Sequence, residues 1–204
     1  MEKKIKQELT FFERVEKMHP YKMILILGLF GSSIIFLFLL GSLFLSLSNV
    51  PEGSIKIPFV FVVSTLLIIA SSLIIQPIRQ YFKAEAKKAL LIALRFTFFL
   101  GIGFAVCQLI GYRHLIQDGV LFNSGISSSF LYVLTGLHAI HFIAAHTYLG
   151  VLLIQTQAIY RDPIKLLMAE TNPYWHLKFE LITKTWHFLG VLWLVLVSTF
   201  WLFL

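Results

Sequence analysis

The chain has 204 residues, of which 58% are hydrophobic and 13% are charged, and its mean hydropathy is +0.83. Soluble domains carry about 25% charged residues, so this composition excludes an ordinary soluble fold and indicates an integral membrane protein. The formal net charge of +7 is compatible with nucleic-acid binding. Most of the basic residues lie in the N-terminal tail and in a few connections on one side, however, and we therefore expect no nucleic-acid partner.

Residues 1–22 precede the first apolar run and mix basic with acidic side chains. In this segment Leu9, Phe11 and Val15 alternate with charged residues, which is typical of a short helix lying on the membrane surface. A solvated tail has the same composition, and both interpretations stay open. Because the segment contains several glutamates, we predict a cytoplasmic tail and not a cleavable signal peptide.

Five apolar runs follow, and each is close to the ~20 residues that an α-helix needs to cross the hydrocarbon of a membrane. They cover residues 23–48, 57–78, 89–111, 128–155 and 181–204. The sequence therefore predicts an all-α fold with one domain, residues 23–204, built as a bundle of five transmembrane helices. The connections between the runs are too short to hold a soluble domain.

Basic residues are distributed unequally between the two sides of this predicted bundle. If the N-terminus is cytoplasmic, that side carries Lys3, Lys4, Lys6, Arg14, Lys17, Lys22, Arg79, Lys83, Lys87, Lys88, Arg161, Lys165 and Lys178. The opposite side carries Lys56 and Arg113, while Arg95 and Lys184 lie inside predicted helices. The positive-inside rule therefore predicts a cytoplasmic N-terminus and a C-terminus on the outer, periplasmic side.

Small residues cluster in the first three predicted helices. The clusters are Gly28, Gly31, Ser32 and Ser33, then Ser64, Thr65, Ala70, Ser71 and Ser72, then Gly101, Gly103 and Ala105. Helices in lipid are held together by close packing and hydrogen bonds and not by a hydrophobic force between them. These clusters therefore predict close helix contacts in all three spans.

Ionisable side chains in apolar runs are concentrated in the last two predicted helices. His138 and His141 are three residues apart and so share a face, and His146 follows about one turn later. The last run opens at Glu180, and at ~1.5 Å per residue His146 and His187 lie at similar depths in the membrane.

A polar stripe runs along the last predicted helix, because Glu180, Lys184 and His187 follow one another at spacings of four and three. Together with His146 on the preceding helix, this stripe predicts a hydrogen-bonded seam between the two helices.

Three interpretations of these side chains stay open. Metal or haem ligation is one, because imidazole is the commonest metal ligand, but no cysteine or acidic residue completes a ligand set. A proton relay is the second, with Glu180 as its only carboxylate. Interhelical hydrogen bonding and subunit contact is the third, and the lack of further ligands favours it. We accordingly predict no catalytic, cofactor-binding or metal-binding residue in this chain.

Two short segments carry a resemblance to a known family. Thr135-Gly136-Leu137-His138-Ala139-Ile140-His141 resembles the T-G-x-H-G-x-H-V segment of subunit III of the haem-copper cytochrome oxidases. The last run is similar to the family's E-x6-H-F-x-D-x-x-W ending, with Glu180, Trp186, His187, Phe188 and Trp193 in the matching positions. Gln108 and the glycines before it are similar to the preceding helix of the family, so the resemblance covers roughly residues 57–204.

The chain departs from the family pattern at several positions. Gly190 stands where the family has an aspartate, Ala139 and Ala145 stand where it has glycines, and Ser32 and Ser33 occupy the place of a glutamate often found there. Many members have seven helices, and the five predicted here resemble a short bacterial form without the first two.

The resemblance implies a non-catalytic subunit of an aerobic respiratory oxidase in the bacterial cytoplasmic (inner) membrane. In this family subunits I and II hold the haems and copper, and subunit III packs against subunit I and supports its proton uptake and turnover. The chain is then expected to hold no cofactor, to contact subunits I and II and membrane lipid, including a bound phospholipid, and to be an enzyme only within an oxygen-reducing, proton-translocating complex.

Other functions stay open as alternatives. Subunit III of a quinol oxidase and a similar accessory protein of nitric oxide reductase share these motifs, and Gln108 favours the cytochrome c type because quinol types often have glutamate there. A small transporter or channel would need a polar path, which the histidines and Glu180 offer. Membership of a larger respiratory supercomplex with a cytochrome c donor is also open.

Overall fold

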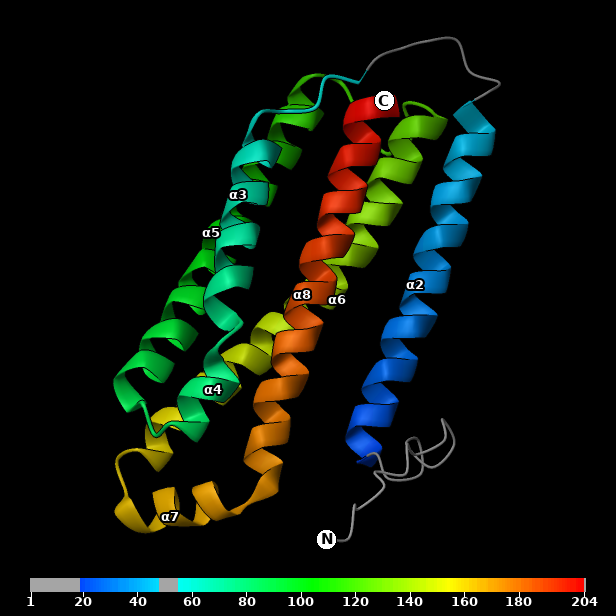
Figure 1. Ribbon diagram of the computed structural model, residues 1–204. Helices are drawn as coiled ribbons and strands as arrows, with labels where there is room; N and C mark the ends of the chain where they lie inside the picture. The colour runs from blue at the N-terminus through cyan, green and yellow to red at the C-terminus, as the bar shows by residue number, and fades with distance from the viewer. Residues whose placement is uncertain (1–18, 48–54, 204) are drawn as a thin grey trace, which may run out of the picture.

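The computed structural model describes residues 19–47 and 55–203 and gives that part of the chain as helices and short connections (Figure 1). The helices are α2 (Pro20–Leu47), α3 (Val60–Ile75), α4 (Ile78–Lys83), α5 (Lys87–Gln117), α6 (Ile126–Ile159), α7 (Pro163–Thr171) and α8 (Pro173–Phe203). Within these described residues, five stretches are long and apolar enough to cross a membrane: α2, α3 with α4, α5, α6 and α8. The predicted all-α, five-span fold is therefore confirmed.

Most helices extend beyond their predicted ends. The third span continues to Gln117 instead of residue 111, and the last begins at Pro173 instead of residue 181. Hydropathy marks only the part of a helix that lies in hydrocarbon, whereas the polar turns beyond it continue the same backbone hydrogen bonds. A proline is well suited to the first turn of a helix, because the amide hydrogen it lacks would have no partner there.

The second span is interrupted where the sequence places Pro77. Proline cannot donate a backbone hydrogen bond and its ring crowds the preceding turn. Helix α3 accordingly ends at Ile75, and α4 resumes at Ile78 after a turn in which Pro77 O accepts from the amides of Gln80 and Tyr81.

The short helix α7 was missed by the sequence analysis. Its start is set by Asp162, whose Oδ1 accepts hydrogen bonds from the amides of Ile164 at 3.0 Å and Lys165 at 3.4 Å. The bond from the Lys165 amide, followed by that from Ile164, lowers the pKa of the Asp162 carboxyl. Hydropathy analysis overlooks such a helix because it is too short to span a membrane.

The long helices lie roughly antiparallel, with α3 along α5 and α6 beside α8, while α2 packs at the edge of α6 and α8 (Figure 1). One end of the bundle holds the start of α2, helix α4, helix α7 and the start of α8; we call it the α7 end. Both connections predicted to be rich in basic residues meet at this end. Most of the tail for which an interfacial helix was proposed, residues 1–18, lies outside the described residues.

Candidate functional site

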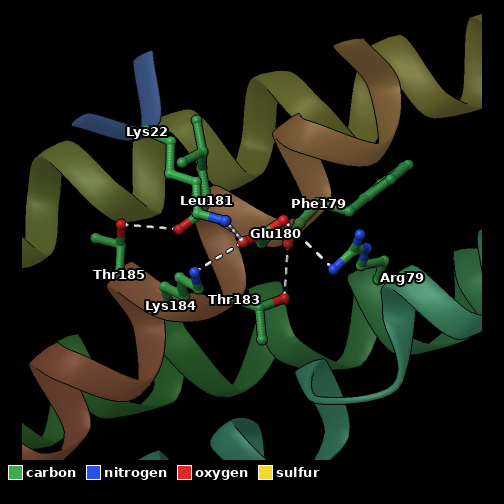
Figure 2. Close-up of polar contacts among 8 residues, drawn as sticks. All are labelled: Lys22, Arg79, Phe179, Glu180, Leu181, Thr183, Lys184 and Thr185. Atoms are coloured by element: carbon green, nitrogen blue, oxygen red, sulfur yellow. Dashed lines mark hydrogen bonds and ion pairs between the residues drawn. The ribbon is translucent and has the colours of Figure 1, made fainter. Parts of the chain in front are cut away.

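The carboxylate of Glu180 is the centre of an ion cluster at the α7 end (Figure 2). Its Oε1 lies 2.7 Å from Nζ of Lys22 and 2.7 Å from Nζ of Lys184, and its Oε2 lies 3.3 Å from Nη1 of Arg79. Lys22 comes from α2, Arg79 from α4, and Lys184 from the next turn of α8. One largely buried carboxylate, whose side chain is 15% exposed, thus joins three helices.

A row of hydroxyl groups on α3 receives the polar side chains of α8. Trp186 Nε1 donates to Ser71 Oγ at 3.0 Å, and about two helical turns later Trp193 Nε1 donates to Thr65 Oγ1 at 3.1 Å. Nδ1 of His187 lies 2.5 Å from Ser72 Oγ, adjacent to the first of these bonds. The family-like ending of the chain is therefore the face of α8 that packs on α3.

The two tryptophans of this contact lie on one face of α8. Trp186 and Trp193 are seven residues apart, which is about two helical turns, and their acceptors Ser71 and Thr65 are six residues apart on α3. The two tryptophans are 1% and 2% exposed, so they lie deep in the contact between α3 and α8.

Helix α5 links the hydroxyl row of α3 to helix α6. Gln108 Nε2 donates to Ser64 Oγ on α3 at 2.9 Å. Tyr112 donates from its hydroxyl to Thr135 Oγ1 on α6, and that threonine donates in turn to the carbonyl of Leu131 at 2.6 Å. Both α5 residues thus link neighbouring helices by hydrogen bonds.

The three histidines of α6 have three different environments. His141 Nδ1 lies 2.7 Å from the carbonyl of Leu137, so this nitrogen carries the proton and donates. Its Nε2, 3.3 Å from Ser32 Oγ, then accepts from that hydroxyl on α2. His138 is 3% exposed, and its ring centroid lies 5.4 Å from that of Trp193.

His146 packs through the face of its ring. Its imidazole is stacked on Phe98, with centroids 4.5 Å apart and planes 11° apart, and on Phe142 at 5.5 Å. The ring also lies over Gly101 of α5, where an added Cβ would come within 2.7 Å of Nδ1. Only a glycine at that position admits the imidazole between α5 and α6.

The polar seam predicted between the last two long helices therefore takes a different course. His187 reaches Ser72 on α3, Lys184 binds Glu180 of its own helix, and His146 contacts aromatic rings. The sequence pattern predicted a contact between the two histidine-bearing helices and gave α3 no part in it. The two tryptophans of α8 and the cluster of hydroxyl residues on α3 were the signal that could have identified α3 as the partner.

The histidines that the structure describes do not gather at one point. Among the described residues, no three His, Cys, Asp or Glu side chains converge as a metal site requires. The imidazoles of His138, His141 and His187 face α8, α2 and α3, respectively. The ring nitrogens of these three histidines therefore lie in different contacts between helices.

The remaining motif positions also lie within the bundle. Phe188 is partly buried against the core, whereas an added Cβ at Gly136 would meet no atom within 4 Å. Gly190, which replaces the family's aspartate, is buried, and a Cβ there would lie 3.9 Å from both Ile68 Cγ1 and Ser72 Oγ. Position 190 thus faces α3, next to the hydroxyl that contacts His187.

Comparison with known proteins identifies relatives along most of the chain. The family model for cytochrome c oxidase subunit III matches residues 9–203. A probable cytochrome c oxidase subunit 3 of Rickettsia prowazekii is 31% identical over 142 residues, which are 70% of this chain and 46% of that protein. Cytochrome c oxidase subunit 3 of Pongo abelii is 29% identical over 153 residues, covering 74% of this chain and 52% of that protein. The chain thus spans about half the length of the curated relatives it matches.

Proposed function

The chain belongs to the cytochrome c oxidase subunit III family, and from this premise we propose that it is a non-catalytic subunit of a haem-copper terminal oxidase. In this role it packs against subunit I, supports proton uptake into that subunit and sustains turnover. Subunits I and II hold the haems and copper, and the assembled complex, not this chain, reduces oxygen.

The observation that supports this proposal is that the motif residues make contacts between helices of the bundle. Trp186, His187 and Trp193 hold α8 on α3, and Glu180 joins α8 to α2 and α4. A catalytic group must reach a substrate or a cofactor, whereas these side chains contact one another. The family signature thus specifies a scaffold, as a supporting subunit requires.

We further propose that this scaffold lies in the bacterial cytoplasmic membrane with its α7 end inside. Support comes from the basic side chains that the fold gathers at that end, in agreement with the positive-inside rule. A cysteine introduced at Lys165 of α7 should resist a membrane-impermeant maleimide in intact cells and react after permeabilisation. Reaction in intact cells would show that the α7 end lies on the outer side of the membrane and would contradict the proposed orientation.

The assembly proposal is tested by purifying the tagged full chain in mild detergent. We expect haem-bearing subunits to co-purify, to be identified by mass spectrometry and to give a haem absorbance spectrum. The chain stripped of these subunits should have no haem band. A haem band retained by the isolated, pure chain would contradict a supporting role.

A matched pair of variants separates assembly from haem binding. His187→Leu removes the contact with Ser72 and should lower the yield of co-purified subunits without changing the haem spectrum per complex. His114→Leu is the control, because that imidazole is exposed at the far end of α5. Loss of haem in the His187 variant at an unchanged subunit yield would instead indicate a ligand.

The electron donor is decided by the same purification. The hydrogen bond from Gln108 to Ser64 places an amide where quinol types often have a carboxylate, and this supports the cytochrome c type. Oxidation of reduced cytochrome c by the purified complex is therefore expected. Turnover with quinol alone would indicate a quinol oxidase, and turnover with nitric oxide in place of oxygen would indicate a nitric oxide reductase. Proton or solute flux through the chain alone in liposomes would indicate a transporter or channel.

A further inference from the structure

A small polar cavity lies between the start of α5 and the end of α6. Its volume is about 190 Å³, and it is lined by Lys87, Leu91, Arg95, Gln157, Tyr160 and Arg161. The α5 residues follow one another at intervals of four, so they form one stripe on the helix surface. The other side is closed by Gln157 in the last turn of α6 and by Tyr160 and Arg161, the two residues after that helix.

The lining of this cavity carries three cations and no carboxylate. Lys87 Nζ donates to the carbonyl of Tyr160 at 2.9 Å and lies 5.4 Å from the centroid of its ring. Within the described chain, the ion pairs involve neither Arg95 nor Arg161. Like charges held together without a counter-charge repel one another, and an anion in the cavity would offset that repulsion.

Arg95 lies at a depth where a membrane offers few counter-charges other than phosphate. Helix α5 has 31 residues and is therefore ~46 Å long, compared with ~30 Å of hydrocarbon. The Cα atom of Arg95 is eight residues, or ~12 Å, from the start of the helix, close to the edge of the hydrocarbon if the helix is centred. A long basic side chain at this depth extends its charge toward the headgroups.

We propose that this cavity binds a phosphate group, carried by an anionic lipid headgroup or by free inorganic phosphate. The guanidinium groups of Arg95 and Arg161 offer paired N–H donors that match two phosphate oxygens. Lys87 keeps two further N–H donors beyond the one given to Tyr160, and the Gln157 amide adds others.

Tyr160 adds a neutral donor to this lining. Burial, followed by the negative charges of Glu170 and Glu85, raises the pKa of its phenol. The hydroxyl therefore keeps its proton at neutral pH and can donate to an anion. Neither glutamate lines the cavity.

Native mass spectrometry of the full chain, with any subunits that co-purify, tests the proposal. The probes are phosphatidylglycerol, sodium phosphate and, as a phosphate-free lipid, monogalactosyl diacylglycerol. Arg95→Gln should weaken binding of the phosphate-bearing probe about tenfold, because it removes charge-assisted hydrogen bonds. Lys88→Gln is the matched control, since this exposed lysine on the first turn of α5 does not line the cavity and its loss should change nothing.

The probes distinguish the two sources of phosphate. Selective binding of phosphatidylglycerol that sodium phosphate does not displace identifies a lipid headgroup, and binding or displacement by sodium phosphate identifies free phosphate. Equal affinities of the Arg95 and Lys88 variants for both probes would overturn the proposal. If the Arg95 variant is poorly produced, Arg161→Gln serves for the same measurement, because Arg161 is exposed, as Lys88 is. A carbodiimide cross-link from Lys87 to an acidic residue of a co-purified subunit would also overturn it.

Discussion

Helices α2 and α3 are both apolar spans with clusters of small residues, yet they pack very differently. In α3, Ser64 and Ser71 are fully buried, and the neighbouring α5 glycine Gly111 admits the ring of Phe61 so closely that an added Cβ would lie 2.7 Å from it. In α2, a Cβ added at Gly28 or Gly31 would meet no atom within 4 Å.

The two helices also differ in what attaches them. Helix α3 is held by hydroxyls that accept from α5 and α8, together with a continuous apolar contact. Helix α2 is held near its start by the pair of Lys22 with Glu180 and, further along, by the contact of Ser32 with His141. Many of its large apolar side chains are exposed, among them Ile24, Leu27, Phe30, Leu37 and Phe38. A cluster of small residues therefore marks a close helix contact within this chain in α3 but not at Gly28 and Gly31 of α2.

The largest effect is expected for Trp186→Ala, at the contact of α8 with α3. This change removes a fully buried indole and its hydrogen bond to Ser71, and should lower the free energy of unfolding by about 3 to 5 kcal/mol. The measurement is denaturant unfolding of the full chain in mild detergent. Trp201→Ala on the same helix is the control, because that ring is 68% exposed and its loss should cost far less. Equal losses would mean that burial at α3 does not set stability.

Glycine substitutions should have opposite signs in the two regions. Gly101→Ala forces a Cβ to within 2.7 Å of His146 and is expected to destabilise the bundle by about 1 to 3 kcal/mol. Gly31→Ala, in the open surface of α2, should instead stabilise its helix by about 0.5 to 1 kcal/mol. Thermal unfolding of both variants in one detergent gives the comparison. A destabilised Gly31 variant would show that α2 has a close neighbour outside the described residues.

Neutralising Glu180 should loosen α2 and leave α3 in place. Glu180→Gln keeps the shape of the side chain but leaves three cations without their shared carboxylate, at an expected cost on the order of 1 kcal/mol. Amide hydrogen exchange should rise in the first turns of α2 and stay unchanged in α3. Glu170→Gln, on α7 and outside the ion cluster, is the control. Faster exchange throughout the bundle would mean that the ion cluster around Glu180 stabilises all the helices and not mainly α2.

The smallest effects are expected from single hydroxyls. Ser72→Ala removes the 2.5 Å contact with His187 and should cost about 1 kcal/mol, whereas Ser32→Ala removes a 3.3 Å contact with His141 and should cost about half as much. Parallel unfolding curves of the two variants measure the difference. A larger loss at Ser32 would reverse the ranking of α2 and α3.

Much of this architecture is readable from the sequence because hydrocarbon requires long apolar helices. The five spans follow from that requirement, and the positions of Trp186, His187 and Glu180 on one helix follow from their spacing. The partners of these residues did not follow, since a serine on any of several helices can meet a histidine. The break at Pro77 and the cap at Asp162 depend on the backbone hydrogen bonds of single residues. A hydropathy average over many residues does not detect them.

The hydroxyls of α3 have a consequence for the order in which the chain is made. Ser64 and Thr65 both donate to the carbonyl of Phe61, and Ser71 donates to that of Ile68, so their hydrogens are satisfied within α3 itself. These three hydroxyls can therefore enter the bilayer early in translation with their hydrogens already bonded, while their oxygen lone pairs stay available. Helix α8, synthesised after α3, brings the indole donors that the lone pairs of Ser71 and Thr65 accept, and so its arrival joins the two helices.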